Sequence, residues 1–358
     1  MSKFNIDDYK LYVETISGGK NTVIADDTGM PSVMYVLPKM YKDTLLVGGA
    51  SEVHSAFVVD DAVKGKVAVS KFLNIVYNNR AYSLPRKDPR ANINFDTAMT
   101  NCRNKGEGWC VTPFTLWAAI ALWCKKNGFQ PHGNNNYGRD VAATWEHGEV
   151  TYTYADGGVT RDGRTATGSG PATWYHDGTY SGIADLNGNV WEWNSGMRIV
   201  DGEIQVIPYS NVSKSTIDVS AASTDWRAID ADGNYIAVGS AGSLKMDRRS
   251  SHIVYTTGTK SETSTSGLGS TFISNTFDET VNDGAKLLLR ELGILPELND
   301  TDYGGDYFYY NLSGERLPIR GGSWGSGAYA GLFSSSFYYP RSSSHRYIGF
   351  RSAFYGDF

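Results

Sequence analysis

The sequence of 358 residues has only three cysteines, Cys102, Cys110 and Cys124, and no two of them form a Cys-x-x-Cys pair. This number and spacing exclude a disulfide framework and a cysteine zinc site, so we expect three reduced thiols. No run of about 18 apolar residues occurs, so we expect no membrane insertion. The amino terminus lacks the apolar core of a secretory signal, and we expect synthesis in the cytoplasm without a signal peptide.

Positive charge is also scarce, because 33 Lys and Arg stand against 38 Asp and Glu, a net charge of -5. Proteins dedicated to nucleic acids normally have a basic surface, so we expect no nucleic-acid partner. The six histidines never occur at the i, i+4 spacing of a zinc protease, and no Gly-x-Ser-x-Gly nucleophile motif is present. Gly325–Ala330 resembles a loose dinucleotide fingerprint, but no helical pattern follows it. These absences favour a protein that is not an enzyme.

Glycine and aromatic residues are abundant, with 40 Gly, 23 Tyr and 9 Trp, which indicates loops and short strands packed around rings. Residues 1–48 are expected to form a small N-terminal module, and residues 49–358 the main domain. From His54 to Tyr82 short β-branched runs predict antiparallel strands, with a turn at Asn78-Asn79. The fold class is predicted to be α+β, with two helices around 94–106 and 112–128 and long loops.

The second helix has the clearer signals. Thr112 is expected to be its N-cap, Pro113 its first residue, and Gly128 its end. Its apolar positions, at helical spacing, are Trp117, Ile120, Ala121 and Cys124. This pattern predicts one face packed on the core.

The stretch from 133 to 182 is rich in Gly, Asp and Asn and has no periodicity, so it needs an anchor. Either bound calcium or a dense web of hydrogen bonds would provide one. Residues 185–193 then predict a turn that leads into a strand. Residues 195–317 look like an insert, with a Ser/Thr-rich loop at 256–270 and a helix at 283–292.

The last 39 residues, 320–358, have an unusual composition: nine Ser, seven Gly and five Tyr, with no Asn, Lys, Glu or Cys. Tyr offers a large, stiff contact surface at little entropic cost, and Ser and Gly add adaptable hydrogen bonds, as in antibody binding loops. A strand region selected for stability would contain more Val, Ile and Leu. This composition predicts either a binding surface or a glycine-rich surface region without a partner.

Four motifs in order resemble the formylglycine-generating-enzyme subtype of the C-type lectin fold: 108–117 (GWCVTPFTLW), 185–193 (DLNGNVWEW), 320–324 (RGGSW) and 348–351 (IGFR). The resemblance covers about residues 50–358. It implies that fold, but the oxidase branch has two cysteines near the positions of Ser326 and Gly331, where this chain has none. The sulfoxide-synthase branch has an additional helical domain with iron-binding histidines, which this sequence also lacks.

The tail instead resembles the variable region of the diversity-generating retroelement variable proteins of phages and bacteria. In that family, errors at adenines change Asn codons into codons for Ser, Tyr, Gly and His, among others. The resemblance implies a variable region at 320–351 held by framework residues. The positions it implies are Ser323, Gly325, Ser326, Tyr329, Ser336, Tyr338, Tyr339, Ser343, His345 and Tyr347. Further candidates are Ala328, Ser334 and Arg346.

Function follows from this resemblance as an expectation. The variable side chains would bind a protein or carbohydrate receptor on a cell surface, and the N-terminal module would dock to a virion or tail partner. Trp191, Trp193 and Trp324 would be structural. An enzyme of unrecognised chemistry and a structural virion component are the alternatives. No cofactor is required.

Asn189 and Glu192 resemble the calcium ligands of the enzyme branch, and oxygen ligands suit calcium. The alternative is that Asn189 holds a turn and Glu192 pairs with a buried arginine such as Arg351. The second interpretation is favoured.

Overall fold

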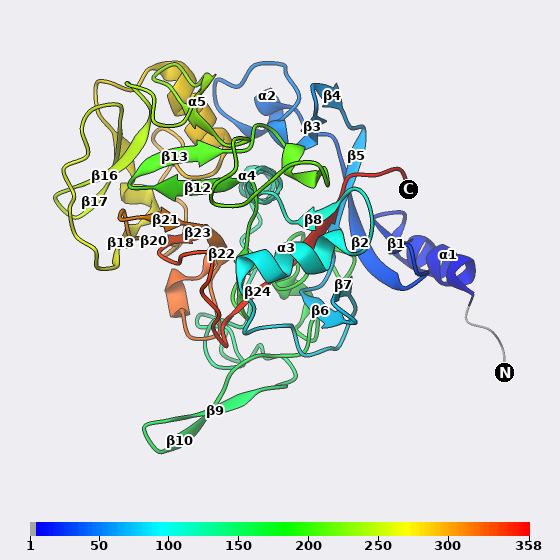
Figure 1. Ribbon diagram of the computed structural model, residues 1–358. Coiled ribbons are helices and arrows are strands. Elements are labelled where there is room, and N and C mark those ends of the chain that lie inside the picture. The colour runs from blue at the N-terminus through cyan, green and yellow to red at the C-terminus, as the bar shows by residue number, and fades with distance from the viewer. Residues whose placement is uncertain (1–4) are drawn as a thin grey trace.

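The computed structural model describes residues 5–358 as a mixed α+β fold, in which strands dominate (Figure 1). Within these residues the helices are α1 (Ile6–Ser17), α2 (Lys42–Leu45), α3 (Phe95–Arg103), α4 (Phe114–Lys126) and α5 (Asp283–Glu291). The helices predicted around 94–106, 112–128 and 283–292 are present as α3, α4 and α5, whereas α1 and α2 were not predicted. In the described part of the chain, no helix has both the length and the apolar character needed to cross a bilayer.

Two sheets form the centre of the molecule. The five-stranded sheet has the order β1 (Asn21–Ala25), β2 (Pro31–Pro38), β5 (Lys66–Ser70), β25 (Ser352–Phe354) and β8 (Trp109–Val111). The six-stranded sheet has the order β18 (Leu268–Thr271), β20 (Tyr307–Tyr310), β23 (Gly331–Phe337), β22 (Ile319–Gly321), β11 (Trp191–Trp193) and β24 (Ile348–Phe350). The pairs β11–β24 and β20–β23 are parallel, so the strands are not all antiparallel as predicted.

The remaining strands form a larger sheet and three hairpins. The eight-stranded sheet contains β12 (Met197–Val200), β13 (Glu203–Val206), β14 (Arg227–Ile229), β15 (Tyr235–Ile236), β16 (Lys245–Arg249), β17 (His252–Thr256), β19 (Thr276–Phe277) and β21 (Glu315–Arg316). The hairpins are β3 (Val58–Val59) with β4 (Ala62–Val63), β6 (Asn74–Tyr77) with β7 (Arg80–Ser83), and β9 (Thr153–Asp156) with β10 (Val159–Asp162). The β9–β10 hairpin projects from the body of the protein (Figure 1).

The boundary predicted at residue 48 does not separate two packing units. β2 pairs with β5 over five residues, from Met34 opposite Ser70 to Pro38 opposite Lys66. β5 in turn pairs with the C-terminal strand β25. The first strands therefore belong to the same sheet as the end of the chain, because strand pairing continues across the predicted boundary.

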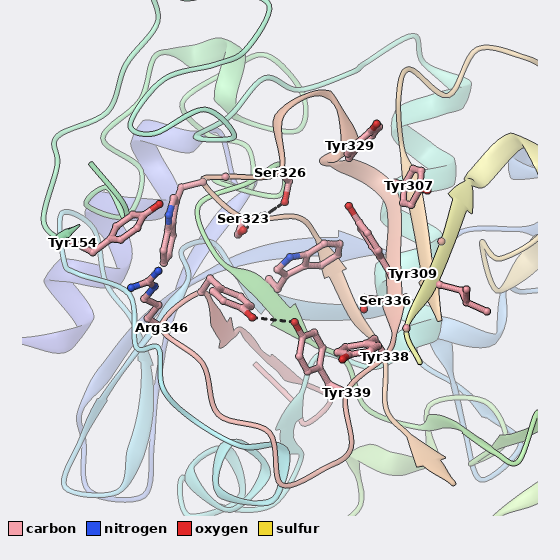
Figure 2. Close-up of a pocket in the computed structure, with 17 residues that line it drawn as sticks. Tyr154, Tyr307, Tyr309, Ser323, Ser326, Tyr329, Ser336, Tyr338, Tyr339 and Arg346 are labelled. Atoms are coloured by element: carbon pink, nitrogen blue, oxygen red, sulfur yellow. Dashed lines mark hydrogen bonds between the residues drawn. The ribbon is translucent and has the colours of Figure 1, made fainter. Parts of the chain in front are cut away.

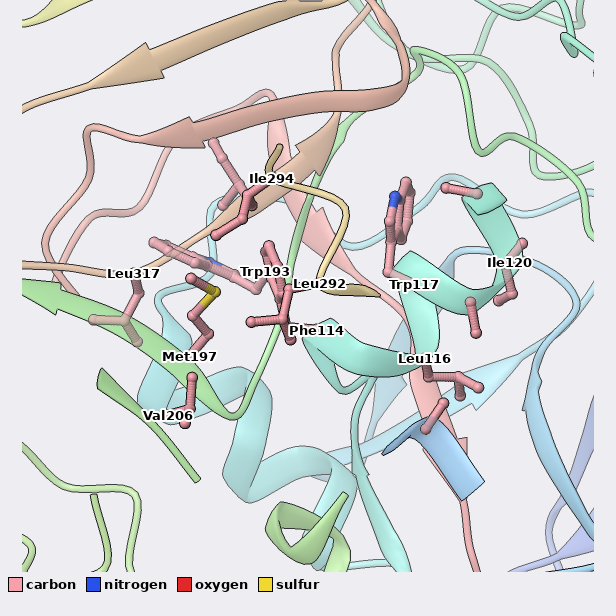
Figure 3. Close-up of a cluster of buried hydrophobic side chains, with 14 of the residues drawn as sticks. Phe114, Leu116, Trp117, Ile120, Trp193, Met197, Val206, Leu292, Ile294 and Leu317 are labelled. Atoms are coloured by element: carbon pink, nitrogen blue, oxygen red, sulfur yellow. The ribbon is translucent and has the colours of Figure 1, made fainter. Parts of the chain in front are cut away.

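Helix α4 lies at the centre of the core (Figure 3). All residues from Phe114 to Leu122 are buried, so the predicted one-sided stripe is wrong: the helix is enclosed on nearly every side. Thr112 is not the N-cap, since its hydroxyl donates instead to the carbonyl of Arg351 at 2.9 Å. Gly128, with φ of +72°, ends the segment as expected.

Other local predictions are confirmed. The helix predicted to begin around residue 94 is α3, and Asn94 caps it by accepting a hydrogen bond from the Thr97 amide at 2.8 Å. Asn78 and Asn79 both have positive φ, as the tight turn between β6 and β7 requires. The three cysteines are free thiols and all are buried.

Candidate functional site

The variable positions that the sequence implies come together on one hollowed face of the protein. A main hollow of about 700 Å³ lies on the six-stranded sheet, and a side hollow of about 540 Å³ adjoins it. The ten positions all line one or both of these hollows: Ser323, Gly325, Ser326, Tyr329, Ser336, Tyr338, Tyr339 and Tyr347 the main hollow, and Ser343 and His345 the side hollow. We call the two hollows together the binding face, and Figure 2 shows the main hollow.

Alternation along the strands explains why the sheet has a binding side and a core side. On β20, Tyr307 and Tyr309 are half-buried and line the main hollow, whereas Phe308 is fully buried. Ser336 on β23 pairs with Tyr309 and lies on the same side. Phe337 points the other way and stacks on Phe308 at 5.5 Å. The period of two therefore places Tyr307, Tyr309 and Ser336 on the side of the hollow, and Phe308 and Phe337 on the side of the core.

Two tyrosines stand at the rim of the main hollow. Tyr329 is 50% exposed and Tyr338 is 40% exposed. The Tyr329 ring contacts Tyr307 with centroids 4.6 Å apart, and the Tyr338 ring meets Tyr339 edge-on at 4.9 Å. Each ring is thus supported on one side and open on the other, which suits contact with a partner.

A ridge separates the two hollows, and Tyr338, Tyr339 and Tyr347 line both of them. The hydroxyls of Tyr339 and Tyr347 are 3.0 Å apart, and the His345 ring lies parallel to the Tyr347 ring at 5.2 Å. Tyr339 and Tyr347 also pack against the hydrophobic core. Burial and the Tyr347 hydroxyl raise the pKa of Tyr339, which keeps its hydroxyl protonated. These two rings therefore support the fold as well as facing the hollows.

Several serines of the tail are buried rather than exposed on the surface. Ser323 and Ser336 are buried and form part of the floor of the main hollow. Ser323 donates its amide to the Ser326 hydroxyl at 3.0 Å. Ser334 is fully buried and its hydroxyl donates to the Tyr329 carbonyl, so this further candidate is structural. Ala328 lines a different hollow.

Sequence reasoning missed the part of the binding face that comes from outside the tail. The predicted insert supplies Gly267, Gly269, Tyr307 and Tyr309, and the β9–β10 hairpin supplies Tyr154. The run of aromatic residues at Tyr307–Tyr310 was an available signal for a strand. The pairing of this strand with β23 was not available, because it joins distant segments.

The tryptophans expected to be structural have two roles. Trp193 is fully buried in the core, and its ring N–H donates to the Ile93 carbonyl at 3.0 Å. Trp191 and Trp324 are buried too, but they also line the main hollow. These two rings form an aromatic floor beneath the positions implied to vary.

The charges on the binding face are all positive. Arg346 lines the main hollow with its guanidinium 4.0 Å from the Tyr154 ring centroid (Figure 2). Arg316 lines the side hollow. Among the described residues that line the two hollows, there is no Asp, Glu or Cys. The lining therefore offers hydroxyls, rings and two guanidinium groups.

Glu192 and Arg351 form the buried ion pair that the sequence favoured over calcium. The Arg351 Nε lies 2.7 Å from one Glu192 carboxylate oxygen, and an Nη lies 2.7 Å from the other. The other N–H groups of Arg351 donate to the carbonyls of Ser70, Lys71 and Ala184. This pair ties β11 to the residue that follows β24.

Asn189 holds a turn, as the same alternative predicted. Its φ is +58°, its side-chain oxygen accepts the Thr165 amide at 3.0 Å, and its side-chain N–H donates to the Thr165 carbonyl at 3.0 Å. Asp140 anchors the same long loop by accepting the amides of Ala142 and Ala143. A web of hydrogen bonds thus supports this loop.

A smaller hollow of about 270 Å³ is lined by Asp306, a buried carboxyl group whose pKa is strongly shifted. Burial raises the pKa of Asp306 to about 7, against the lowering effects of the Phe333 amide and Arg320. One Asp306 oxygen accepts the Phe333 amide at 2.6 Å. The Asp306 carboxyl therefore fixes the start of β23, and this contact gives it a structural role.

Comparison with family models and with curated proteins found no match. Among solved structures, the chain has a distant similarity to the Major Tropism Determinant P3c, I1 and U1 variants. The sequence identities are 10%, 11% and 10%, and the TM-scores are 0.33, 0.32 and 0.31. Each match covers 93% of this chain and 71% of the other. Scores this low do not establish a common fold.

Proposed function

We propose that the protein is a non-enzymatic binding protein whose sequence is diversified at the binding face, on a C-type lectin scaffold of the formylglycine-generating-enzyme subtype. The observation that carries the proposal is the convergence of the ten implied variable positions on two adjoining hollows. These positions come from four separate segments of the tail: 323–329, 336, 338–339 and 343–347. A glycine-rich tail without a partner gives no reason for such convergence.

The strands beneath the face support the proposal that the face is carried by a stable scaffold. Ser336 and Tyr309 face the hollow, whereas Phe308 and Phe337 on the same strands pack on the core, so on these strands the side chains of the face are separate from those of the core. Rigid display lowers the entropic cost of binding. The partner is a receptor on a cell surface, and the protein is encoded by a phage or prophage, synthesised in the cytoplasm and carried on the virion.

The neighbouring DNA tests this proposal directly. We expect a reverse-transcriptase gene and a near-copy of the codons for residues 320–351, with Asn codons at the implied positions. Substitutions between the two copies should fall on the ten implied positions and leave Trp324 and Ile348 unchanged. A genome with neither feature would contradict diversification.

A further inference from the structure

We infer that the partner presents an acidic polypeptide surface whose carboxylates enter both hollows, one to meet Arg346 and the other Arg316. This inference rests on the proposed binding function and adds the chemistry of the ligand. It starts from a contrast: the chain has a net charge of -5, yet the described lining of the two hollows contains two arginines and no acid.

Arg316 supplies an independent observation. It is half-buried in the side hollow, and its Nε is a buried donor without a hydrogen-bond partner among residues 5–358. A buried donor without an acceptor costs free energy, and a carboxylate is the acceptor that fits a guanidinium best. Arg316 therefore brings to the side hollow a guanidinium whose hydrogen-bonding capacity is not fully used by the described residues.

Arg346 is placed differently but is also open. Its guanidinium lies over the Tyr154 ring, and none of the contacts of the described residues joins it to an acid. Stacking orients the planar group and leaves its N–H edge free for a bidentate contact with a carboxylate. Other arginines of the chain, such as Arg164 with Asp88, have acidic partners within the protein.

The shape of the face favours a polypeptide over a small anion. Tyr329 and Tyr338 project at the rim, and a ridge that includes Tyr339 divides two hollows of about 700 and 540 Å³. An occupant that reaches both arginines must cross this ridge and accept the projecting rings. A protein surface with carboxylates on either side of a groove meets both conditions, and Tyr and Arg are the residues that dominate such contacts.

The experiment uses a random peptide library displayed on phage and selected on the full chain. Peptides are kept when they do not bind the double variant Tyr329→Ala/Tyr338→Ala but still bind the control variant Tyr12→Ala/Tyr77→Ala. The control removes two exposed tyrosines that lie outside the face. We expect these face-dependent peptides to be enriched in Asp and Glu. Their affinity should fall about tenfold or more when those residues become Asn and Gln.

The matching change on the protein is Arg316→Gln/Arg346→Gln. Its control is Arg90→Gln/Arg139→Gln, which removes two exposed arginines that line neither hollow. The first pair of substitutions should lower the affinity for acidic peptides about tenfold or more, and the control pair should leave this affinity unchanged. Equal effects of the two pairs, or face-dependent peptides without acidic residues, would overturn the inference and leave the binding function standing.

Two further outcomes separate the remaining explanations. Acidic oligosaccharides that bind through the same arginines, without any acidic peptide, would overturn the polypeptide partner. A selection that yields no face-dependent peptide and no such oligosaccharide would contradict the proposed binding function itself.

Discussion

The hydroxyl groups of Tyr339 and Tyr347 lie 3.0 Å apart on the ridge between the two hollows. Both rings pack on the core on one side and line the hollows on the other. The ridge is therefore held by a contact between two positions that are both implied to vary. Their identities are coupled, because a substitution at one removes the partner of the other.

A double-mutant cycle measures this coupling. Tyr339→Phe and Tyr347→Phe should each lower the free energy of unfolding by about 1 kcal/mol, the net value of one hydrogen bond. The double variant should lose no more than either single variant, because the bond is already absent. Urea unfolding provides the measurement, and strictly additive losses would show that the hydroxyls do not interact.

The buried pair of Glu192 and Arg351 predicts a much larger effect. Arg351→Lys removes the bidentate contact and leaves buried carbonyls without donors, so we expect a loss of about 3–5 kcal/mol in the free energy of unfolding. The control is Arg161→Lys, whose ion pair with Asp156 on the projecting hairpin is partly exposed and should cost less than about 1 kcal/mol. Similar unfolding midpoints for the two variants would contradict the role assigned to Arg351.

Calcium is predicted to leave stability unchanged. Glu192 directs both carboxylate oxygens at Arg351, and the Asn189 oxygen accepts the Thr165 amide, so a calcium ion would have to displace these contacts. We expect the same melting temperature with a chelator and with added calcium. A rise with calcium, absent in an Asn189→Ala variant, would restore calcium as the anchor of the long loop.

Asp306 predicts a specific dependence of stability on pH. Its pKa is raised to about 7 in the folded protein, against about 3.9 in an unfolded chain. Between these values the folded state binds more protons, so the free energy of unfolding falls as pH rises, by at most about 1.4 kcal/mol per pH unit. Above pH 7 this contribution is lost.

The variant Asp306→Asn isolates that contribution, because Asn stays neutral. The stability of the wild type relative to this variant should decline between pH 4 and 7 and then level off, as measured by urea unfolding at each pH. An exposed control, Asp61→Asn, should follow the wild type throughout. A constant difference between wild type and Asp306→Asn would show that Asp306 is already ionised at acid pH.

Local signals in the sequence predicted local structure well. The helix start around residue 94, the turn at Asn78-Asn79 and the helix end at Gly128 each depend on the backbone of a few neighbouring residues. Thr112 shows the limit of this approach. The sequence predicted that its hydroxyl would cap the following helix. The hydroxyl instead donates to the carbonyl of Arg351, which lies 239 residues away in the sequence.

The same limit applies to the binding face. The positions in the tail could be predicted from composition and from the resemblance, because they lie in one short segment of the sequence. The part of the face contributed by the insert could not be predicted in this way. β20 joins the six-stranded sheet by pairing with β23, and β18 joins it by pairing with β20. Loop closure over such distances leaves no periodic trace in the sequence. Residues 195–317 were therefore predicted to be an elaboration, although they carry part of the face.

A substitution at Gly267 tests whether the part of the face contributed by the insert positions Tyr338. A Cβ at Gly267 would lie 2.3 Å from the Tyr338 ring, too close for any side chain, so Gly267→Ala should push that ring out of its place at the rim. The control is Gly65→Ala, because a Cβ there meets nothing within 4 Å and the backbone is not left-handed.

Because Tyr338 is already 40% exposed, its displacement should change the free energy of unfolding by less than about 1 kcal/mol. Affinity for peptides selected on the wild-type face should nevertheless fall, by an amount approaching the effect of Tyr338→Ala, whereas Gly65→Ala should leave it unchanged. Titration of one such peptide against the three variants compares them. Full affinity in Gly267→Ala would mean that the insert encloses the hollow without placing the ring that binds.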